Sequence, residues 1–198
     1  MTQGLTGTPH LGPSPPSPWV ERFAPLVRPG GPVLDLACGG GRHSRLFAAH
    51  GHPVTAVDLD VRGVEDLRGT VEIVPADLEN GRPWPLGDRR FAGIVVTNYL
   101  HRPLFPALLD ALEPGGVLLY ETFMRGNARF GRPSAAAFLL GSGELLERVA
   151  GRLQIVAFEQ GEVSSPKAAV VQRICAVADL SPGHGLDGDP EPRPLPTA

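Results

Sequence analysis

The stretch Val33–Ser44, with the sequence VLDLACGGGRHS, constrains the fold of this chain more than any other segment. A short apolar run ends in a cluster of glycines and passes directly into a helical pattern. This order is the sequence form of a strand, a tight turn and a helix whose first N–H groups face a ligand. Glycine lets the backbone approach a ligand that a Cβ atom would repel. The segment therefore predicts a nucleotide-like ligand at the N-terminus of a helix.

Strand and helix patterns alternate along the chain. The apolar runs predict strands over 33–37, 54–58, 71–75, 91–98 and 117–120, and a closing antiparallel hairpin over 153–158 and 168–177. Helical patterns fall at 42–50, 61–67 and 104–112, after an N-cap at Ser17, and after a second N-cap at Ser142. The run FAGIVVTN is continuously apolar, as expected of a parallel strand that is covered on both faces. The order predicts a Rossmann-like α/β fold, a doubly wound sheet that is mostly parallel with a closing antiparallel hairpin.

The chain of 198 residues predicts a single domain over residues 17–180. The flanking segments 1–16 and 181–198 are rich in Pro and Gly and poor in large apolar side chains. Such segments bury too little surface to offset the entropy of ordering them, so we expect two disordered tails.

Charge and composition exclude several classes of partner. The net charge of −3 and the pI near 6.1 argue against nucleic acid. No apolar run approaches the roughly 20 residues of a membrane span, and no signal peptide begins the chain, so we expect a cytoplasmic protein without a membrane partner. The two cysteines, Cys38 and Cys175, lie far apart in sequence, which argues against a disulfide scaffold and against a zinc site. His43, His50 and His52 have no Cys or acidic partner near them in sequence, so we expect no metal site. We expect a monomer or a homodimer.

Acidic residues at the ends of successive strands describe the ligand further. Asp58 ends the second strand nineteen residues after Gly39, where a carboxylate can accept hydrogen bonds from ribose hydroxyls. Asp77 follows the third strand on the same predicted sheet edge. The dinucleotide fingerprint G-x-G-x-x-G does not fit, because Ser44 stands where a third glycine would be required. Starting the fingerprint at Ala37 fails as well.

The pattern D-x-x-x-G-x-G formed by Asp35, Gly39 and Gly41 resembles the first motif of class I S-adenosylmethionine-dependent methyltransferases. The resemblance covers roughly residues 17–178 and implies the seven-stranded fold of that family, with S-adenosyl-L-methionine as cofactor and S-adenosyl-L-homocysteine as product. In size and in the wording of the segment LDLACGGGRHS, the chain is similar to the tellurite-resistance type of small bacterial methyltransferase. The cofactor site that the resemblance implies consists of Asp35, Ala37, Gly39, Gly41, Asp58, Leu59, Asp77, Leu78 and Asn98. Ala37 replaces the usual first glycine, and we expect its φ to stay negative.

The resemblance also places the segment after the fourth strand beside the transferable methyl group. His101 is the candidate general base, because its unperturbed pKa lies near neutrality. Tyr99 is expected to line the methyl pocket or to hold the nucleophile, and Arg102 to pair with an anionic group of the substrate. In the structural alternative, His101 caps the next helix and Arg102 is a solvated charge.

A second candidate patch begins at the end of the fifth strand. The long segment 124–141 that follows is rich in glycine and arginine, and long insertions in compact domains are usually functional. The resemblance implies that it forms part of the acceptor pocket, with Glu121, Asn127, Phe130 and Arg132 as lining residues. The alternative is a surface loop beneath which the phenylalanines pack. Trp19 and Phe23, in the first helix, are expected in the core rather than at the ligand.

These observations predict an enzyme that moves a methyl group from S-adenosylmethionine to a small molecule. An RNA or protein acceptor is the runner-up. It is disfavoured by the absence of a basic stripe and of an Asn-Pro-Pro-aromatic motif, since Tyr99 follows Asn98. An NAD-dependent oxidoreductase or a non-catalytic nucleotide-sensing module is the alternative of another class.

Overall fold

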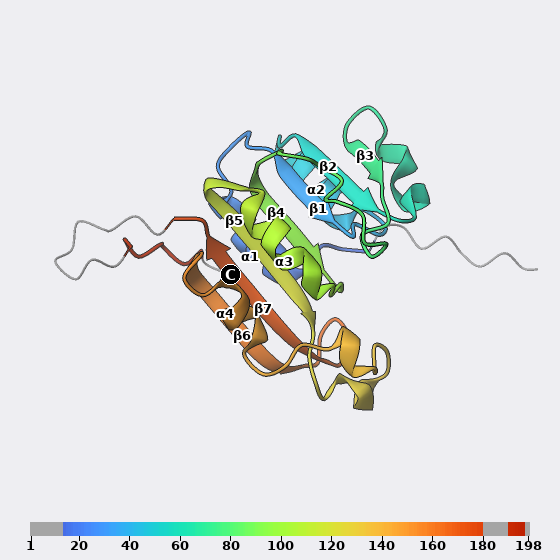
Figure 1. Cartoon of the computed structure of the whole chain (residues 1–198), viewed down its shortest axis with the longest axis vertical. Helices are drawn as coiled ribbons and strands as arrows, with labels where there is room; N and C mark the ends of the chain where they lie inside the picture. Colours follow the sequence, from blue (N-terminus) through green and yellow to red (C-terminus); the bar gives the residue numbers. More distant parts are fainter. Residues whose placement is uncertain (1–13, 180–189, 197–198) are drawn as a thin grey trace, which may run out of the picture.

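The structure, a computed structural model, describes residues 14–179 and 190–196. Its centre is one seven-stranded sheet with the order β3-β2-β1-β4-β5-β7-β6 (Figure 1). The strands are β1 (Val33–Leu36), β2 (Val54–Asp58), β3 (Glu72–Pro75), β4 (Phe91–Thr97), β5 (Leu112–Phe123), β6 (Gln154–Val163) and β7 (Ala169–Val177). Strands β1 to β5 pair in parallel, whereas β7 runs antiparallel to both β5 and β6. The predicted Rossmann-like sheet with a closing antiparallel hairpin is confirmed.

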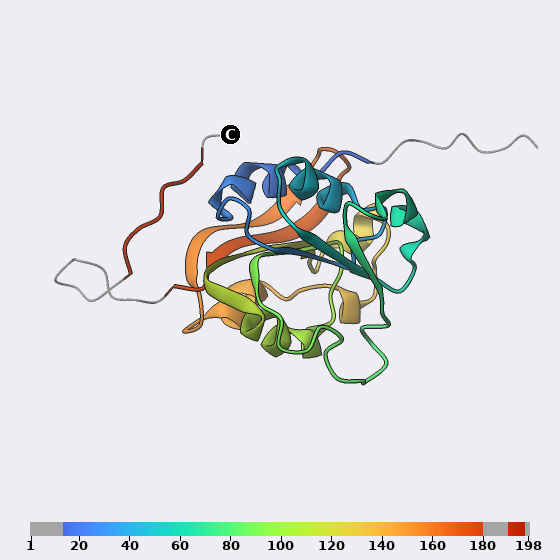
Figure 2. The ribbon, with the colours of Figure 1, turned by 90° about the horizontal axis from the view of Figure 1, so that it is seen from above.

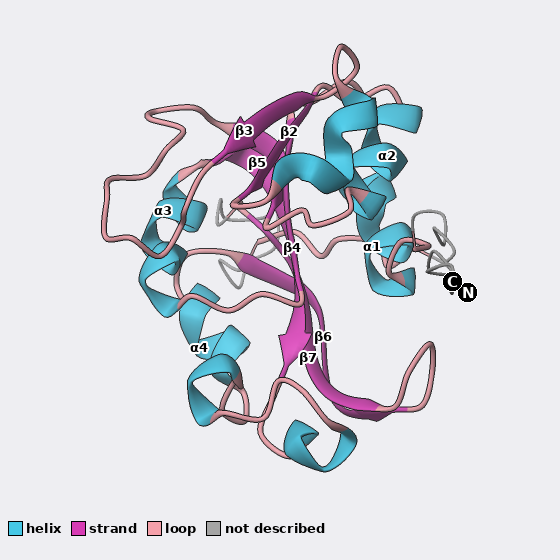
Figure 3. Ribbon diagram, turned by 90° about the vertical axis from the view of Figure 1, so that its right-hand side faces the viewer, coloured by secondary structure: helices cyan, strands magenta, loops and turns pink. Residues whose placement is uncertain are grey.

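Helices cover both faces of this sheet (Figures 2 and 3). The α-helices are α1 (Pro18–Phe23), α2 (Arg42–Ala49), α3 (Phe105–Asp110) and α4 (Glu144–Val149). Short 3-10 helices, labelled η, are η1 (Ala24–Leu26), η2 (Val61–Leu67), η3 (Arg102–Leu104), η4 (Asn127–Phe130) and η5 (Ala136–Phe138). Figure 3 views the sheet edge-on, with α1 and α2 on one face and α3 and α4 on the other.

Each face has its own hydrophobic core. Trp19, Phe23 and Phe47 pack with the α1–α2 face, and Phe105 and Leu145 with the opposite face. All five side chains are buried. The sheet is therefore buried on both sides, which explains the continuously apolar sequence of its central strand β4. Trp19 and Phe23 belong to this core, as predicted.

The helix ends follow their local sequence. Ser17 caps α1 by accepting a hydrogen bond from the Trp19 N–H at 3.2 Å, and Pro18 occupies the first helical position. Gly51 follows α2 with φ +81°, the left-handed conformation that commonly ends a helix. Both caps agree with the sequence prediction.

The structure corrects two predicted boundaries. Residue 112 is not helical: Leu112 begins β5 and pairs with Phe91, so β5 runs through the Pro114–Gly116 segment that was predicted to precede it. Gly116 permits this close passage, since a Cβ there would lie 2.8 Å from the carbonyl oxygen of Phe91. The N-cap of α4 is Gly143 with φ +69°, not Ser142. The Ser142 hydroxyl instead accepts a hydrogen bond from Gln160.

Most of the two predicted disordered tails, residues 1–13, 181–189 and 197–198, lies outside the described residues, as does residue 180. Within the described part of the second tail, the carbonyl oxygens of Glu191 and Pro196 accept hydrogen bonds from Gln154 and Arg22. Over the described ranges, no helix is long and apolar enough to cross a bilayer.

Candidate active site

A cleft opens at the carboxyl ends of β1, β2 and β4, where open α/β sheets bind ligands. It consists of two adjoining hollows of about 440 and 390 Å³, which share Ala37, Asp58 and Tyr99. We call the two together the glycine cleft. Its lining residues are Ser14, Ala37, Cys38, Gly39, Gly40, Arg42, Asp58, Leu59, Ala76, Asp77, Leu78, Glu79, Thr97, Asn98 and Tyr99.

The glycines after β1 have two different tasks. A Cβ at Gly39 or Gly40 would meet no atom within 4 Å, so both residues leave open space beside the cleft. Gly41, the N-cap of α2, has φ +69°, and a Cβ there would lie 2.4 Å from Val64 of η2. Gly41 therefore serves packing, and it does not line the cleft. Ala37 has φ +53°, which corrects the expectation of a negative φ and places an alanine in a strained left-handed conformation.

Asp58 lies where the two hollows of the glycine cleft adjoin, and two backbone N–H groups hold its carboxylate. One of its carboxylate oxygens accepts the backbone N–H of Gly39 at 2.8 Å, and the other accepts the N–H of Asp60 at 3.0 Å. Each oxygen has a second lone pair for a ligand. The carboxylate thus joins the end of β2 to the glycine turn and remains able to accept hydrogen bonds.

Asp35 lies beneath the cleft instead of lining it, which corrects its assignment as a cofactor contact. Its side chain is 1 % exposed and accepts both the N–H and the hydroxyl of Ser44, at 2.8 and 2.6 Å. Burial raises the pKa of Asp35 to about 6, against the lowering effect of the Ser44 hydrogen bonds. Asp35 therefore fixes the first turn of α2 under the glycines.

The outer part of the glycine cleft contains the other predicted cofactor residues. Asp77 and Leu78 line it beyond β3, opposite Leu59, whose side chain is 71 % exposed. Tyr99 lines both parts, and burial raises the pKa of its hydroxyl. Asn98 has φ +57° and lies where β4 ends. An apolar wall beside acidic groups suits a flat ring that carries hydrogen-bond donors.

A third hollow of about 200 Å³ adjoins the cleft, and we call it the side hollow. Arg42 and Asn98 line both the side hollow and the glycine cleft, so the two spaces meet at these residues. The other lining residues of the side hollow are Glu121, Phe123, Asn127, Phe130, Arg132, Val163, Ser165, Pro166, Lys167, Ala168, Ala169, Val171 and Arg173. Four of the five predicted substrate residues line this one space: Glu121 in β5, and Asn127, Phe130 and Arg132 in the segment that follows β5.

Two of these residues also hold the wall of the side hollow together. The Asn127 amide donates to the Pro133 carbonyl at 3.0 Å and accepts the Val170 N–H at 3.0 Å, so the amide joins the 124–141 segment to β7. Glu121 is 8 % exposed. One of its oxygens, Oε2, accepts the Ser17 hydroxyl at 3.0 Å and lies 2.8 Å from Nε of Arg173.

The N-terminal segment passes along the junction of the two spaces. The Ser17 N–H donates to Nε2 of His43 at 3.1 Å, and the Arg42 guanidinium lies 3.4 Å from the Pro15 carbonyl oxygen. Burial lowers the pKa of His43 to about 3, so the imidazole is neutral and can accept the Ser17 proton. Ser14 lines the glycine cleft.

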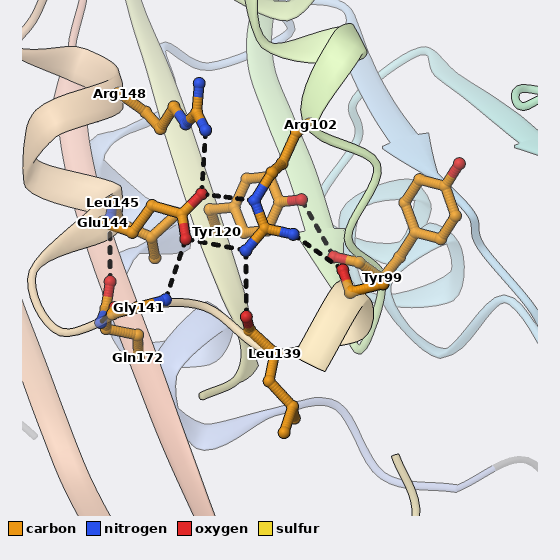
Figure 4. Close-up of polar contacts among 10 residues, drawn as sticks. Tyr99, Arg102, Tyr120, Leu139, Gly141, Glu144, Leu145, Arg148 and Gln172 are labelled. Carbon is orange, nitrogen blue, oxygen red and sulfur yellow. Dashed lines mark hydrogen bonds and ion pairs between the residues drawn. The ribbon is translucent and has the colours of Figure 1, made fainter. Parts of the chain in front are cut away.

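Arg102 and His101 line none of the three hollows. The Arg102 guanidinium donates to both carboxylate oxygens of Glu144 at 2.7 and 2.8 Å, and to the carbonyl oxygens of Ala137 and Leu139 (Figure 4). These bonds occupy the guanidinium, which corrects its assignment to a substrate anion. His101 is the N-cap position of η3 without a side-chain cap bond. Tyr120 accompanies the cluster and donates to the Tyr99 carbonyl at 2.9 Å, while the Tyr99 ring points away from it (Figure 4).

Sequence reasoning missed three cations of the site: Arg42, Lys167 and Arg173. The sequence could have indicated Arg42, because a cation at the first position of a helix is unfavourable next to the positive end of the helix dipole. A residue placed there against this preference is a candidate for ligand binding. No such signal marked the other two, which reach the side hollow from the β6–β7 turn and from β7. Among the described residues, no three His, Cys, Asp or Glu side chains gather closely enough to hold a metal ion.

Similar proteins agree with this geometry. The sequence pattern of a family described as a methyltransferase domain matches residues 10–155. Ribosomal protein L11 methyltransferases from Burkholderia lata and Burkholderia vietnamiensis are each 37% identical to the chain over 102 residues. These matches cover 50% of the chain and 33% of the relatives, so the chain matches about a third of their length.

Solved structures share the fold at low identity. TehB from Haemophilus influenzae superimposes with a TM-score of 0.65 and 20% identity, over 80% of this chain and 60% of that one. The 1,6-didemethyltoxoflavin-N1-methyltransferase of Burkholderia thailandensis was solved with S-adenosylhomocysteine and 1,6-didemethyltoxoflavin. It superimposes with a TM-score of 0.58 and 24% identity, over 81% of this chain and 76% of that one. The chain thus belongs to the methyltransferase-domain family and has the fold of the class I, S-adenosylmethionine-dependent methyltransferases.

Proposed function

We propose that this chain transfers a methyl group from S-adenosylmethionine to a small-molecule acceptor and releases S-adenosylhomocysteine. The observation that carries the proposal is the pair of spaces that meet at Arg42 and Asn98. A methyl transfer needs two ligands whose reacting atoms touch, and two joined spaces at one sheet edge provide for that.

The glycine cleft has the groups that the donor requires. The open space beside Gly39 and Gly40 admits the amino-acid part of the donor near the N-terminus of α2. Asp58 would accept hydrogen bonds from the ribose hydroxyls. Asp77 would accept a hydrogen bond from the adenine amino group. The adenine ring would contact the apolar side chains of Leu59 and Leu78.

S-adenosylmethionine supplies a methyl group that its sulfonium has already activated, so the protein contributes chiefly alignment. Asn98 and Tyr99, at the end of β4, would position the reacting atoms at the junction. Glu121 replaces His101 as the proposed proton acceptor, because it lines the side hollow and His101 does not. Its Oε1 receives no hydrogen bond from the described residues, so it can accept one from a hydroxyl or amino group of the acceptor.

Calorimetric titration with S-adenosylmethionine, S-adenosylhomocysteine and NAD tests the donor site. We expect the first two to bind, and Asp58→Ala to weaken both about tenfold or more, because the ribose loses a charged hydrogen-bond acceptor. Asp60→Ala is the matched control, since this neighbouring carboxylate pairs with Arg62 and does not line the cleft. Tight NAD binding would overturn the assignment. Tight donor binding without turnover would favour a nucleotide-sensing module.

A protein acceptor is the second candidate, favoured by the match to ribosomal protein L11 methyltransferases. The match extends over half of this chain, and two thirds of each relative has no counterpart in it. Purified ribosomal protein L11, incubated with the chain and labelled S-adenosylmethionine, separates the candidates. We expect no label in the protein fraction; stoichiometric labelling would replace the small-molecule acceptor.

A further inference from the structure

We propose that the side hollow selects an organic anion, so that the methyl acceptor is a small molecule with a carboxylate and a compact apolar body. The proposal rests on the proposed function, because it names the substrate class of the same site. The observation behind it is a group of cations without carboxylate partners around one space.

Four cations and one acid line the side hollow: Arg42, Arg132, Lys167, Arg173 and Glu121. The Glu121 carboxylate lies 2.8 Å from Nε of Arg173, and the same guanidinium also lies 3.4 Å from a Glu159 oxygen. Arg173 is 17 % exposed and Glu121 11 % by side chain, so the pair is a largely buried part of the wall. The charge of Glu121 is therefore already balanced.

The other three cations form no ion pair with a carboxylate of the described residues, although the charge of Arg42 acts on the buried Asp35. Arg42 touches two neutral oxygens, the Pro15 carbonyl at 3.4 Å and the Thr97 hydroxyl at 3.5 Å, and both contacts are long. Arg132 and Lys167 are exposed and form no hydrogen bond or ion pair with described side chains. Arg129, on the same segment as Arg132, pairs with Glu162. Three unpaired positive charges around about 200 Å³ favour an anion, and an arginine can bind a carboxylate through two hydrogen bonds.

The apolar residues that line the side hollow select the uncharged part of the ligand. Phe123, Phe130, Val163 and Val171 contribute apolar surface to the side hollow. Its volume lies below the usual range for ligand sites, roughly 300–1,000 Å³, which restricts the acceptor to a compact molecule. An inorganic ion would leave this apolar surface in water, and a polynucleotide would not enter. A small aromatic or branched carboxylic acid satisfies both the charge and the wall.

Calorimetry in saturating S-adenosylhomocysteine tests the proposal with matched acid and amide pairs. The probes are benzoate against benzamide, 4-hydroxybenzoate against 4-hydroxybenzamide, and inorganic phosphate alone. We expect the better acid to bind at least about tenfold more tightly than its amide, since the amide has the same shape without the charge. Arg132→Gln and Lys167→Gln should each weaken the acid about threefold to tenfold and leave the amide unchanged. Arg125→Gln is the matched control, because Arg125 is an exposed cation of the same segment outside the side hollow.

The outcomes separate the two proposals. Three results would each overturn the anion proposal. The first is that neither acid binds more tightly than its amide. The others are an unchanged acid affinity in both glutamine variants, and binding of inorganic phosphate as tight as that of the best acid. S-adenosylhomocysteine affinity should stay the same in all three variants. Loss of S-adenosylhomocysteine binding by the unmodified chain would instead overturn the proposed function.

Discussion

At the scale of single residues, Ala37 has a strained backbone conformation, which its position in the glycine turn imposes. Its φ of +53° is a conformation that costs an L residue roughly 1–2 kcal/mol relative to the right-handed region. Glycine has no such cost, although it gains entropy in the unfolded state. We therefore expect Ala37→Gly to raise the free energy of unfolding by about 0.5–1 kcal/mol, measured by urea denaturation.

The matched control for Ala37→Gly is Ala48→Gly. Ala48 lies within α2, where glycine costs about 1 kcal/mol, so this variant should lose stability. Equal losses in the two variants would contradict the strain at residue 37.

Single residues also mark the limit of what the sequence could predict about the site. The pattern of Asp35, Asp58 and Asp77 at successive strand ends predicted the cleft, and all three lie at that edge. It could not tell that Asp35 turns beneath the glycines to Ser44, because this depends on which face of β1 its side chain takes. Arg102 was misassigned for a similar reason: its partner Glu144 lies 42 residues further along the chain.

At the scale of elements, the Arg102–Glu144 cluster joins η3 to the start of α4 and to the 137–139 segment (Figure 4). The hydrogen bonds from Arg102 lower the pKa of Glu144 to about 2, against the opposing effect of burial. Glu144 also accepts the Gly141 N–H at 2.9 Å and ion-pairs with Arg148 at 3.0 Å. One carboxylate therefore ties η3 and the backbone at Gly141 to the first turns of α4.

We expect Glu144→Ala to lower the free energy of unfolding by about 2 kcal/mol, because it leaves a half-buried guanidinium without its counter-charge. Urea denaturation near neutral pH measures the change. Glu147→Ala is the matched control in the same helix, since Glu147 is exposed and its carboxylate has no partner among the described side chains. A loss no larger than that of the control would show that the cluster adds nothing to stability.

Element types were more predictable than element ends. The strands and most helices follow from apolar periodicity and caps that act within a few residues, as Ser17 and Gly51 illustrate. The start of β5 could not be predicted, because Leu112 is fixed by pairing with Phe91 across the sheet. The apolar positions 104, 108 and 112 suit a helix equally well until that pairing is known.

At the scale of the whole molecule, the N-terminal segment connects the parts of the site. Ser17 contacts His43 of α2 through its N–H and Glu121 of β5 through its hydroxyl. The His43 side chain lies 3.5 Å from the Thr97 hydroxyl of β4. The glycine cleft, the side hollow and α1 thus share one buried polar network, whose only imidazole among the described residues is neutral. The protonation of this network contributes to the stability of the entire fold.

Two buried groups, His43 and Asp35, make opposite contributions to stability as the pH falls. The pKa of His43 is lowered to about 3, so below about pH 6.5 protons bind the unfolded chain first and stability is lost. The pKa of Asp35 is raised to about 6, so below that pH protons bind the folded chain first and stability is gained. Between about pH 6 and about pH 4.5, each effect amounts to about 2 kcal/mol.

We therefore expect these two effects to cancel in the unmodified chain and to appear separately in variants. Asp35→Asn should lose about 2 kcal/mol of unfolding free energy between about pH 6 and about pH 4.5, since only the His43 effect remains. His43→Gln should gain a similar amount, since only the Asp35 effect remains. Urea denaturation at several pH values within this window measures both slopes, with the double variant, which lacks both groups, as the baseline control. Parallel pH profiles for the unmodified chain and the two single variants would mean that neither group titrates differently in the folded and unfolded states.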